Sequence, residues 1–285
     1  MHFFNNQGKI TCANVLSDLY AMGVTEVDNM LMILGISEKL ELDIRDKVVK
    51  MIIRGYFDTA KDAGTVVTGG QTIRNPWFLL GGVASSVSHN SEILKPVNSV
   101  VGDVLVLTKP LGTRAAVNAH LALYDEARRE KLLTKVTEDN VIECYNTAIK
   151  SMIRLNRNAA ILMKKYHANA ATDVTGFGIL GHADQLARNQ TKKLKFRLDK
   201  LPFFKHCLAL EDALGFGLLY GKSAETSGGL LVSMSKNNAE EFMKELFEVD
   251  GCKSFIVGTV EDLDSDYIGM NYAYLADSLE VVEDN

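Results

Sequence analysis

Cysteine is scarce in this sequence, and long apolar runs are missing. The four cysteines are scattered with no CxxC pair, which argues against a structural zinc site or a disulfide framework and favours reduced thiols. No apolar run approaches the roughly 18 residues that a membrane span needs. The first seven residues lack the basic and apolar regions of a signal peptide. We therefore expect a cytoplasmic protein with no membrane partner.

Basic residues are not in excess, and proline is rare. The 31 Lys and Arg are outnumbered by 36 Asp and Glu, for a net charge of −5, which disfavours a domain that grips a nucleic-acid backbone. With only 4 prolines and no Ser/Gly-rich tract, a long flexible linker is not expected. What is present is the balance of an ordinary globular protein, long enough for two domains.

Hydrophobic periodicity predicts helices and strands in irregular alternation. Helices are expected over residues 9–22, from Ser37 to Gly64, and over about 113–133, 138–153, 156–166 and 238–248. Strands are expected at residues 30–34, 65–68, 77–87, 104–107, 193–199, 228–234, 254–260 and 273–283. The mixture lacks a strict βαβ repeat, so we predict an α+β fold. A change of texture at Lys109–Gly112 predicts two domains, residues 1–108 and 109–285.

The first predicted helix carries a polar face that lacks a basic residue. Thr11, Asn14 and Asp18 are spaced i, i+3 and i+7, so they share one side of the helix. Asp18 also lies near the helix C-terminus, where the macrodipole is unfavourable for a carboxylate. This face is either solvated or holds a cation at Asp18, with Asn14 as a supporting ligand.

A double glycine follows the predicted strand 65–68. Glycines let successive backbone N–H groups turn toward an anion, and the hydroxyl groups of neighbouring residues add donors. Gly69, Gly70, Gln71 and Thr72 are therefore candidates for phosphate binding. The alternative is a plain turn, which is what most Gly-Gly pairs form.

A third segment, Thr172–His182, contains the spacing G-x-G-x-x-G at Gly176, Gly178 and Gly181. A dinucleotide site is disfavoured, because residues 166–171 make a poor buried strand and Asp173 would repel a pyrophosphate. An acid beside a glycine-rich helix start fits a metal-bridged phosphate better. Asp18 and Asp173, together with two glycine turns, suggest binding of a nucleotide with Mg²⁺.

Other residues of chemical interest have structural explanations. The glycine turn in Glu225–Leu230 is interpreted as structural. His89 and His182 lack a second His or Cys at ligand spacing. Cys12 fits a small buried apolar residue better than a nucleophile. We predict no catalytic side chain from these residues.

Five motifs taken in order carry a family resemblance. Ala13–Gly23, Val67–Trp77, Gly102–Gly112, Thr172–His182 and Glu225–Leu230 closely resemble selenophosphate synthetase (selenide, water dikinase), the eukaryotic form most of all. The family belongs to the aminoimidazole-ribonucleotide-synthetase superfamily. The resemblance implies two α+β domains, a homodimer formed through the first domain, and ATP bound at the interface. It also implies synthesis of selenophosphate, AMP and phosphate from ATP, selenide and water with Mg²⁺, supplying selenium for selenocysteine.

The resemblance also implies roles for individual residues. Asp18 matches a ligand of Mg²⁺ and ATP, Asp173 a second metal ligand, and Gly69–Thr72 the segment that touches the ATP phosphates. The family's reactive Cys or selenocysteine, a nearby Lys and two further aspartates have no match, so an N-terminally truncated and inactive chain is expected. Two alternatives stay open: another kinase of the superfamily, such as one resembling thiamine-monophosphate kinase, and a non-enzymatic paralogue that acts by protein interaction.

Overall fold

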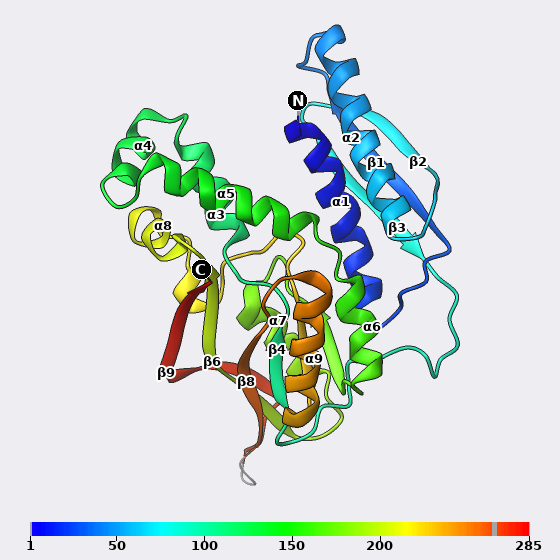
Figure 1. Cartoon of the computed structure of the whole chain (residues 1–285), viewed down its shortest axis with the longest axis vertical. Coiled ribbons are helices and arrows are strands. Elements are labelled where there is room, and N and C mark those ends of the chain that lie inside the picture. The colour runs from blue at the N-terminus through cyan, green and yellow to red at the C-terminus, as the bar shows by residue number, and fades with distance from the viewer. Residues whose placement is uncertain (1, 264–266, 285) are drawn as a thin grey trace.

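The computed structural model describes residues 2–263 and 267–284 and contains two β-sheets surrounded by helices (Figure 1). In chain order the elements are α1 (His2–Ala21), β1 (Asn29–Ser37), α2 (Leu42–Asp62), β2 (Val67–Asn75), β3 (Leu79–Ser85), β4 (Val104–Leu107), α3 (Thr113–Ala122), α4 (Glu126–Leu133), α5 (Glu138–Ile153), α6 (Arg157–Lys165), β5 (Ala170–Asp173), α7 (Gly178–Arg188), β6 (Leu194–Phe204), α8 (Cys207–Leu214), β7 (Leu230–Met234), α9 (Lys236–Asp250), β8 (Phe255–Asp262) and β9 (Tyr272–Asp284). The predicted α+β class is confirmed. Among the described residues, no helix combines the length and hydrophobicity needed to cross a bilayer.

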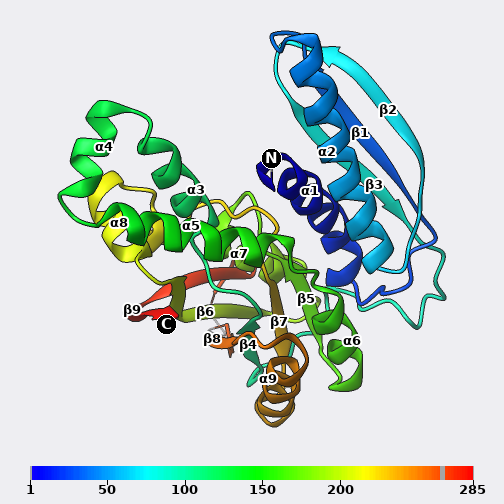
Figure 2. The same ribbon diagram turned by 45° about the horizontal axis from the view of Figure 1, so that its top comes forward.

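The smaller sheet has the strand order β2-β1-β3, with β2 parallel and β3 antiparallel to β1. Alternate residues of β1 are buried, because Met30, Met32 and Leu34 join the core with residues of α1 and α2. Leu31 and Ile33 face the other way and are exposed. The two helices therefore cover one face of this sheet (Figure 2), and its outer face is apolar and open.

One predicted break is wrong. The double glycine does not end the strand, because β2 runs through Gly69 and Gly70 and pairs with β1 as far as Asn75. The glycines instead accompany an irregularity: the register slips between the pairs Met30–Val67 and Leu31–Gly69, which leaves Thr68 as an extra residue. Glycine inside a strand marks such a bulge as often as it marks a turn.

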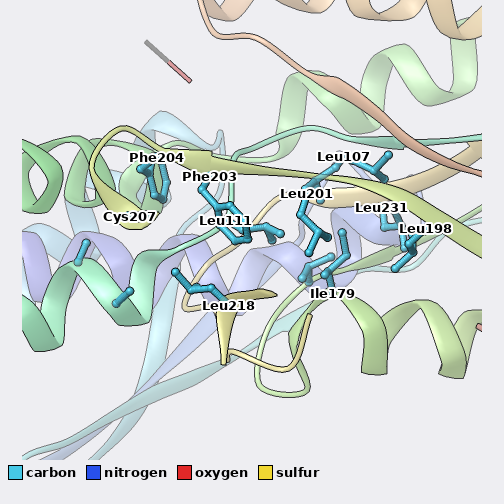
Figure 3. Close-up of a cluster of buried hydrophobic side chains, with 14 of the residues drawn as sticks. Leu107, Leu111, Ile179, Leu198, Leu201, Phe203, Phe204, Cys207, Leu218 and Leu231 are labelled. Atoms are coloured by element: carbon cyan, nitrogen blue, oxygen red, sulfur yellow. The ribbon is translucent and has the colours of Figure 1, made fainter. Parts of the chain in front are cut away.

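The larger sheet has the order β5-β7-β4-β8-β6-β9. Its central strand β4 is buried on both faces because helices lie on each side (Figures 1 and 2). Leu105 and Leu107 join one apolar cluster with residues of α3, α5, α7 and α8, part of which is shown in Figure 3. Val104 and Val106 join a second cluster with α6 and α9. This alternation explains why the predicted strand 104–107 reads as a continuous apolar run.

The second apolar cluster joins the two sheets. It contains Leu16 and Tyr20 of α1, Met30 of β1, and Val232 and Phe242 of the larger sheet and its helix α9. In both views α1 lies between the smaller sheet and the helices α5 and α6 (Figures 1 and 2). Helix α1 therefore supports residues of both halves.

Most remaining elements occur where they were predicted, but several bounds differ. The first helix begins at His2 rather than at residue 9, and β6 continues to Phe204 rather than ending at residue 199. Helix α8 was not predicted. The helix expected over 113–133 is two helices, because the chain turns at Leu123–Asp125 and the Asp125 side chain caps α4 by accepting from the Arg128 N–H. The helix expected after Ser37 begins five residues later, at Leu42. A strand, β5, occupies residues 170–173, where the sequence favoured none.

Candidate functional site

Asp18 and Asp173 lie close together, although 155 positions (173 − 18) separate them in the sequence. Asp18 is exposed on the last turns of α1, and Asp173 ends β5, which packs beside α1. Partial burial and then the neighbouring charge of Asp173 raise the pKa of Asp18. No salt bridge to either carboxylate occurs within the described ranges. Two acids are thus held near one another without a paired cation.

Ser17 fixes the carboxylate of Asp173 from the α1 side. Burial raises the pKa of Asp173, while a hydrogen bond from Ser17 and the charge of Lys109 oppose that rise. Ser17 in turn accepts from the Asn156 Nδ2 at 3.0 Å, and the same amide group donates to the Gly228 carbonyl at 2.9 Å. Asp173 is therefore positioned by a chain of buried polar groups, which is the arrangement that a preorganised ligand needs.

The segment Glu225–Gly229, here called the 225–229 loop, contacts both α1 and the residues that follow Asp173. The Ser227 N–H donates to the Asn14 Oδ1 at 3.0 Å, so the polar face of α1 rests on this loop. Ser227 adopts a positive φ of 48° and its Oγ donates to the Met152 carbonyl at 2.7 Å. The Asn14 side chain is thus bonded to the loop, although it is also exposed to solvent.

Lys109 is a fully buried amine beneath the same loop. Its Nζ donates to the Arg154 carbonyl at 2.7 Å and to the Ser227 carbonyl at 3.0 Å. Burial, followed by the charge of Arg154, lowers the pKa of Lys109 well below its usual range. The amine therefore acts here as a hydrogen-bond donor to two backbone segments.

Glu225 is a buried carboxylate at the start of α3. Its Oε1 accepts from the Gly112 N–H at 2.8 Å, and its Oε2 accepts from the Thr113 N–H at 2.9 Å and from the Thr113 Oγ1. Burial raises the pKa of Glu225 to about 7, although the bonds from Thr113 and Gly112 oppose that rise. The helix N-terminus, with its free N–H groups and positive dipole end, suits this anion. The structural interpretation of the glycine turn 225–230 agrees with these contacts.

The candidate phosphate segment lies elsewhere. Gly69–Thr72 belong to β2, the edge of the smaller sheet on the far side of β1 from β3, and α1 packs on β3. The four residues are exposed, and they line a groove of about 460 Å³ with Met32, Leu34, Ile53 and Phe57. The structure thus brings Asp18 and Asp173 together but leaves Gly69–Thr72 on another element of the same chain.

The rejection of a dinucleotide site at Gly176–Gly181 agrees with the strand topology. A short strand does precede the glycines, contrary to the expectation, but β5 pairs antiparallel with β7 and is not adjacent to β6. A dinucleotide-binding βαβ unit requires neighbouring parallel strands. His182 is buried and its Nε2 lies 3.2 Å from the Thr175 Oγ1 and 3.3 Å from the Phe177 N, which matches its expected structural role.

The donor set at Asp18 and Asp173 fits Mg²⁺ better than a transition metal. Within the described ranges, no group of three or more His, Cys, Asp or Glu side chains could hold a metal ion. Mg²⁺ commonly uses one or two carboxylates and completes its octahedron with water and phosphate oxygens. A cation would also relieve the repulsion that raises the pKa of Asp18. The two aspartates therefore fit a metal that a phosphate ligand shares.

Several residues of this site were not singled out by the sequence. Ser17 and Lys109 lie within two of the motifs that carry the family resemblance, but no role was assigned to either side chain, and Asn156 lies in none of the five. The one usable signal was Lys109, two positions after the end of the apolar strand 104–107, because a charge that is buried beside such a strand needs a polar partner.

Comparisons with known proteins place the chain in a family. Residues 1–87 match the AIR synthase related protein N-terminal domain, and residues 100–271 match the C-terminal domain of the same name. The selenide, water dikinase of Dictyostelium discoideum is 52% identical over 263 residues, which cover 92% of this chain and 72% of that protein. Selenide, water dikinase 2 of Homo sapiens is 47% identical over 97% of this chain and 61% of its own length.

This chain belongs to the selenide, water dikinase family. The resemblance stated from the five motifs is confirmed. Among solved structures, thiamine-monophosphate kinase from Stenotrophomonas maltophilia matches with a TM-score of 0.68 at 20% identity, covering 97% of this chain and 79% of that one. The hydrogenase maturation protein HypE in complex with ATP matches with a TM-score of 0.67 at 13% identity, covering 95% and 77%. At such identities these structures show a shared fold.

Proposed function

We propose that the chain provides the metal- and nucleotide-binding part of an enzyme that converts ATP, selenide and water into selenophosphate, AMP and phosphate. The names of its relatives support this reaction, and the selenophosphate would supply selenium for selenocysteine. The observation that carries the proposal is the pair Asp18 and Asp173, two neighbouring carboxylates that form no salt bridge with any basic side chain among residues 2–263 and 267–284.

In this proposal Asp18 and Asp173 hold Mg²⁺. When bound, the metal neutralises the charge of the triphosphate and orients it for attack. The protein's contribution is positioning: Ser17 orients Asp173, and Asn14 is held by Ser227 one turn away from Asp18. Such preorganisation supplies most of the rate in phosphoryl transfer, where little covalent chemistry falls to side chains.

We further propose a homodimer formed through the smaller sheet. The outer face of that sheet presents exposed apolar side chains from all three strands: Leu31, Ile33, Ile73, Leu79 and Val83. A contiguous apolar face of this kind favours association. A second copy seated there would bring a Gly69–Thr72 segment to the subunit interface, where ATP is expected. The proposed role of these four residues in ATP binding depends on that arrangement.

Two organisational proposals accompany this function. The division into domains 1–108 and 109–285 remains a proposal, and the pairing of β4 with β7 and β8 favours a boundary nearer residues 88–99, between the two family matches. We propose the cytosol as the location, because all four cysteines are free thiols and reducing compartments maintain that state.

The test combines this chain with a chimera in which it replaces the matching segment of the Dictyostelium discoideum relative. Each protein is incubated with ATP and Mg²⁺, with and without selenide, and followed by ³¹P NMR. Selenophosphate and AMP should appear only with the chimera and only when selenide is present, because the chain alone lacks the reactive Cys or selenocysteine of the family. Phosphoryl transfer to thiamine monophosphate instead would favour another kinase of the superfamily, and no turnover by either protein would favour a non-enzymatic paralogue.

A further inference from the structure

The 225–229 loop contacts both elements that carry the metal-binding aspartates. The Glu225 N–H donates to the Thr175 carbonyl at 2.9 Å, and the Val174 N–H donates to the Gly229 carbonyl at 2.9 Å, so the loop lies along the segment that follows Asp173. On its other side the Ser227 N–H reaches Asn14 of α1. The relative position of α1 and the end of β5 therefore depends on where this loop lies.

Glu225 fixes the loop to a third element. Only 5% of its surface is exposed, and its carboxylate accepts three hydrogen bonds from Gly112 and Thr113 at the N-terminus of α3. The Thr113 Oγ1 also accepts from the Thr226 N–H at 3.0 Å. The Thr113 hydroxyl thus donates to the Glu225 carboxylate and accepts from the loop backbone at Thr226. The loop therefore cannot shift without breaking its bonds to α3.

We propose that Glu225 is a positioning residue for the metal site: by anchoring the 225–229 loop to α3 it holds Asp18 and Asp173 at the separation that one shared cation requires. The proposal rests on the proposed function. Asp18 lies on α1 and Asp173 ends β5, so the separation of the two carboxylates depends on what connects these elements. The loop connects them through Asn14 on one side and Thr175 and Val174 on the other.

The arrangement requires an acceptor on both oxygens of the side chain. Both backbone donors and the hydroxyl point at Glu225, and a Gln side chain offers one acceptor oxygen and one donor NH₂ group. Glu225→Gln therefore leaves at least one N–H of Gly112 or Thr113 facing another donor. Because the change keeps the size of the side chain, it weakens the anchor without creating a cavity.

The chain offers a matched control in Glu211. This glutamate also accepts two backbone N–H groups, from Phe216 at 2.6 Å and Gly217 at 3.0 Å, but those bonds close the end of α8 rather than the metal site. Glu211→Gln should therefore cost stability in the same way without reaching Asp18 or Asp173. Comparing the two variants separates positioning from general destabilisation.

The experiment measures binding of Mn²⁺, as a paramagnetic substitute for Mg²⁺, by electron paramagnetic resonance on the full chain, alongside thermal unfolding. Glu225→Gln should weaken Mn²⁺ affinity about tenfold, and Glu211→Gln less than twofold at a similar loss of melting temperature. Equal Mn²⁺ affinity in wild type and Glu225→Gln would overturn the positioning role while the proposed function stands. Absence of Mn²⁺ binding by the wild type would overturn the proposed function and with it this role.

A second pair of variants covers the case in which Glu225→Gln fails to fold. Thr113→Val removes the hydroxyl that bonds to Glu225 and to the Thr226 N–H, whereas Thr113→Ser keeps it. Thr113→Val should lower Mn²⁺ affinity about threefold, and Thr113→Ser should restore it. If both variants bind Mn²⁺ as the wild type does, the anchor does not control the metal site.

Discussion

Two double glycines in this chain look alike in sequence but have different structural roles. Gly69-Gly70 lies on an exposed edge strand, where only the second glycine is needed: it has a φ of +140°, and a Cβ there would lie 1.8 Å from the Met32 carbonyl oxygen. Gly228-Gly229 lies in the buried 225–229 loop, where added Cβ atoms would lie 2.1 Å from the Val174 oxygen and 2.5 Å from the Lys109 nitrogen. The first pair permits a bulge, and the second permits backbone to pack on backbone.

The difference shows what a Gly-Gly motif does and does not predict. Gly69-Gly70, the candidate for phosphate binding, lies in a hydrogen-bonded strand. Gly228-Gly229, which was interpreted as structural, lies next to the candidate metal site. Both interpretations used only the neighbouring sequence. The role of each glycine pair depends instead on tertiary packing, because only the 225–229 loop is buried against α1 and β5. Substitutions at the two glycine pairs and at Asp18 test this difference.

Gly228→Ala is expected to be the most damaging of these substitutions. The added methyl group would overlap the Val174 carbonyl in a loop held on both sides, so overpacking should cost about 3 kcal/mol of unfolding free energy. Urea denaturation measures this loss. Gly176→Ala is the control, because nothing lies within 4 Å of its added Cβ and its stability should be unchanged. A tolerated Gly228→Ala would mean that the loop is not rigid.

Gly70→Ala should cost less, about 2 kcal/mol, because an L residue at φ +140° is strained but an edge strand can move outward. A larger residue at Gly70 would therefore disturb the strand itself, so loss of nucleotide affinity in such a variant would not isolate a phosphate contact. Hydrogen exchange should show the damage confined to amides of β1 and β2. Loss of protection in β4 and β7 as well would contradict the difference between the two regions.

The two regions also differ in charge, and Asp18→Asn tests this difference. Removing one ligand should lower Mg²⁺ affinity about tenfold, or 1.4 kcal/mol, as measured by calorimetry.

The pKa values of Asp18 and Asp173 are raised, so both carboxyls bind protons more tightly in the folded chain than in the unfolded chain. Metal-free protein should therefore lose stability as pH rises through these raised values and gain it as pH falls toward 3.8, below which the gain is complete.

Saturating Mg²⁺ should oppose that trend, because the metal competes with the protons and binds more tightly as pH rises. Asp18→Asn should flatten the dependence of stability on pH in the metal-free protein. Thermal unfolding between pH 4 and pH 8, with and without Mg²⁺, checks both statements. An unchanged pH dependence in Asp18→Asn would show that the two aspartates are not coupled.

Gly69→Ala should have the smallest effect. Its Cβ would meet only the Leu31 Cδ2, at an ordinary 3.6 Å, so the change in stability should stay within about 0.5 kcal/mol. Reduced Mg²⁺-ATP affinity in a variant that keeps its stability would support the proposed contact of Gly69–Thr72 with the phosphates. Unchanged affinity would weaken that proposal, because the substitution leaves the strand in place.

The sequence predicted helices and buried strands where periodicity was long or apolar. The helix 138–153 and the strand 104–107 occur at the predicted residues, because a sustained pattern leaves few alternatives. Asp18 could be singled out because it is an acid without a basic partner on its helix, and Asp173 because it precedes a glycine-rich helix start. β5 could not be predicted, because Ala-Ala-Thr-Asp lacks the uniformly apolar character of the strand 104–107 and this strand is stabilised by its pairing with β7.

The supporting residues of the site could not be predicted for a different reason. Lys109 follows a strand and precedes Pro110-Leu111-Gly112, a sequence typical of an exposed turn. Its burial results from the closure of the 225–229 loop over it, more than 100 positions later in the chain. No pattern within a window of 20 residues carries that information, because the partner atoms are backbone carbonyls of Arg154 and Ser227.

The bond between Asn14 and Ser227 spans 213 positions, and this separation has a consequence for biosynthesis. At about 5–20 residues per second, a ribosome needs roughly 10–40 seconds between making the two residues. During that interval α1 has no loop to rest on, and the buried surfaces of Leu16 and Tyr20 lack β7 and α9, which complete the cluster they belong to. During translation α1 therefore exposes apolar surface that the finished fold covers, and we expect a chaperone that binds such surface to protect it.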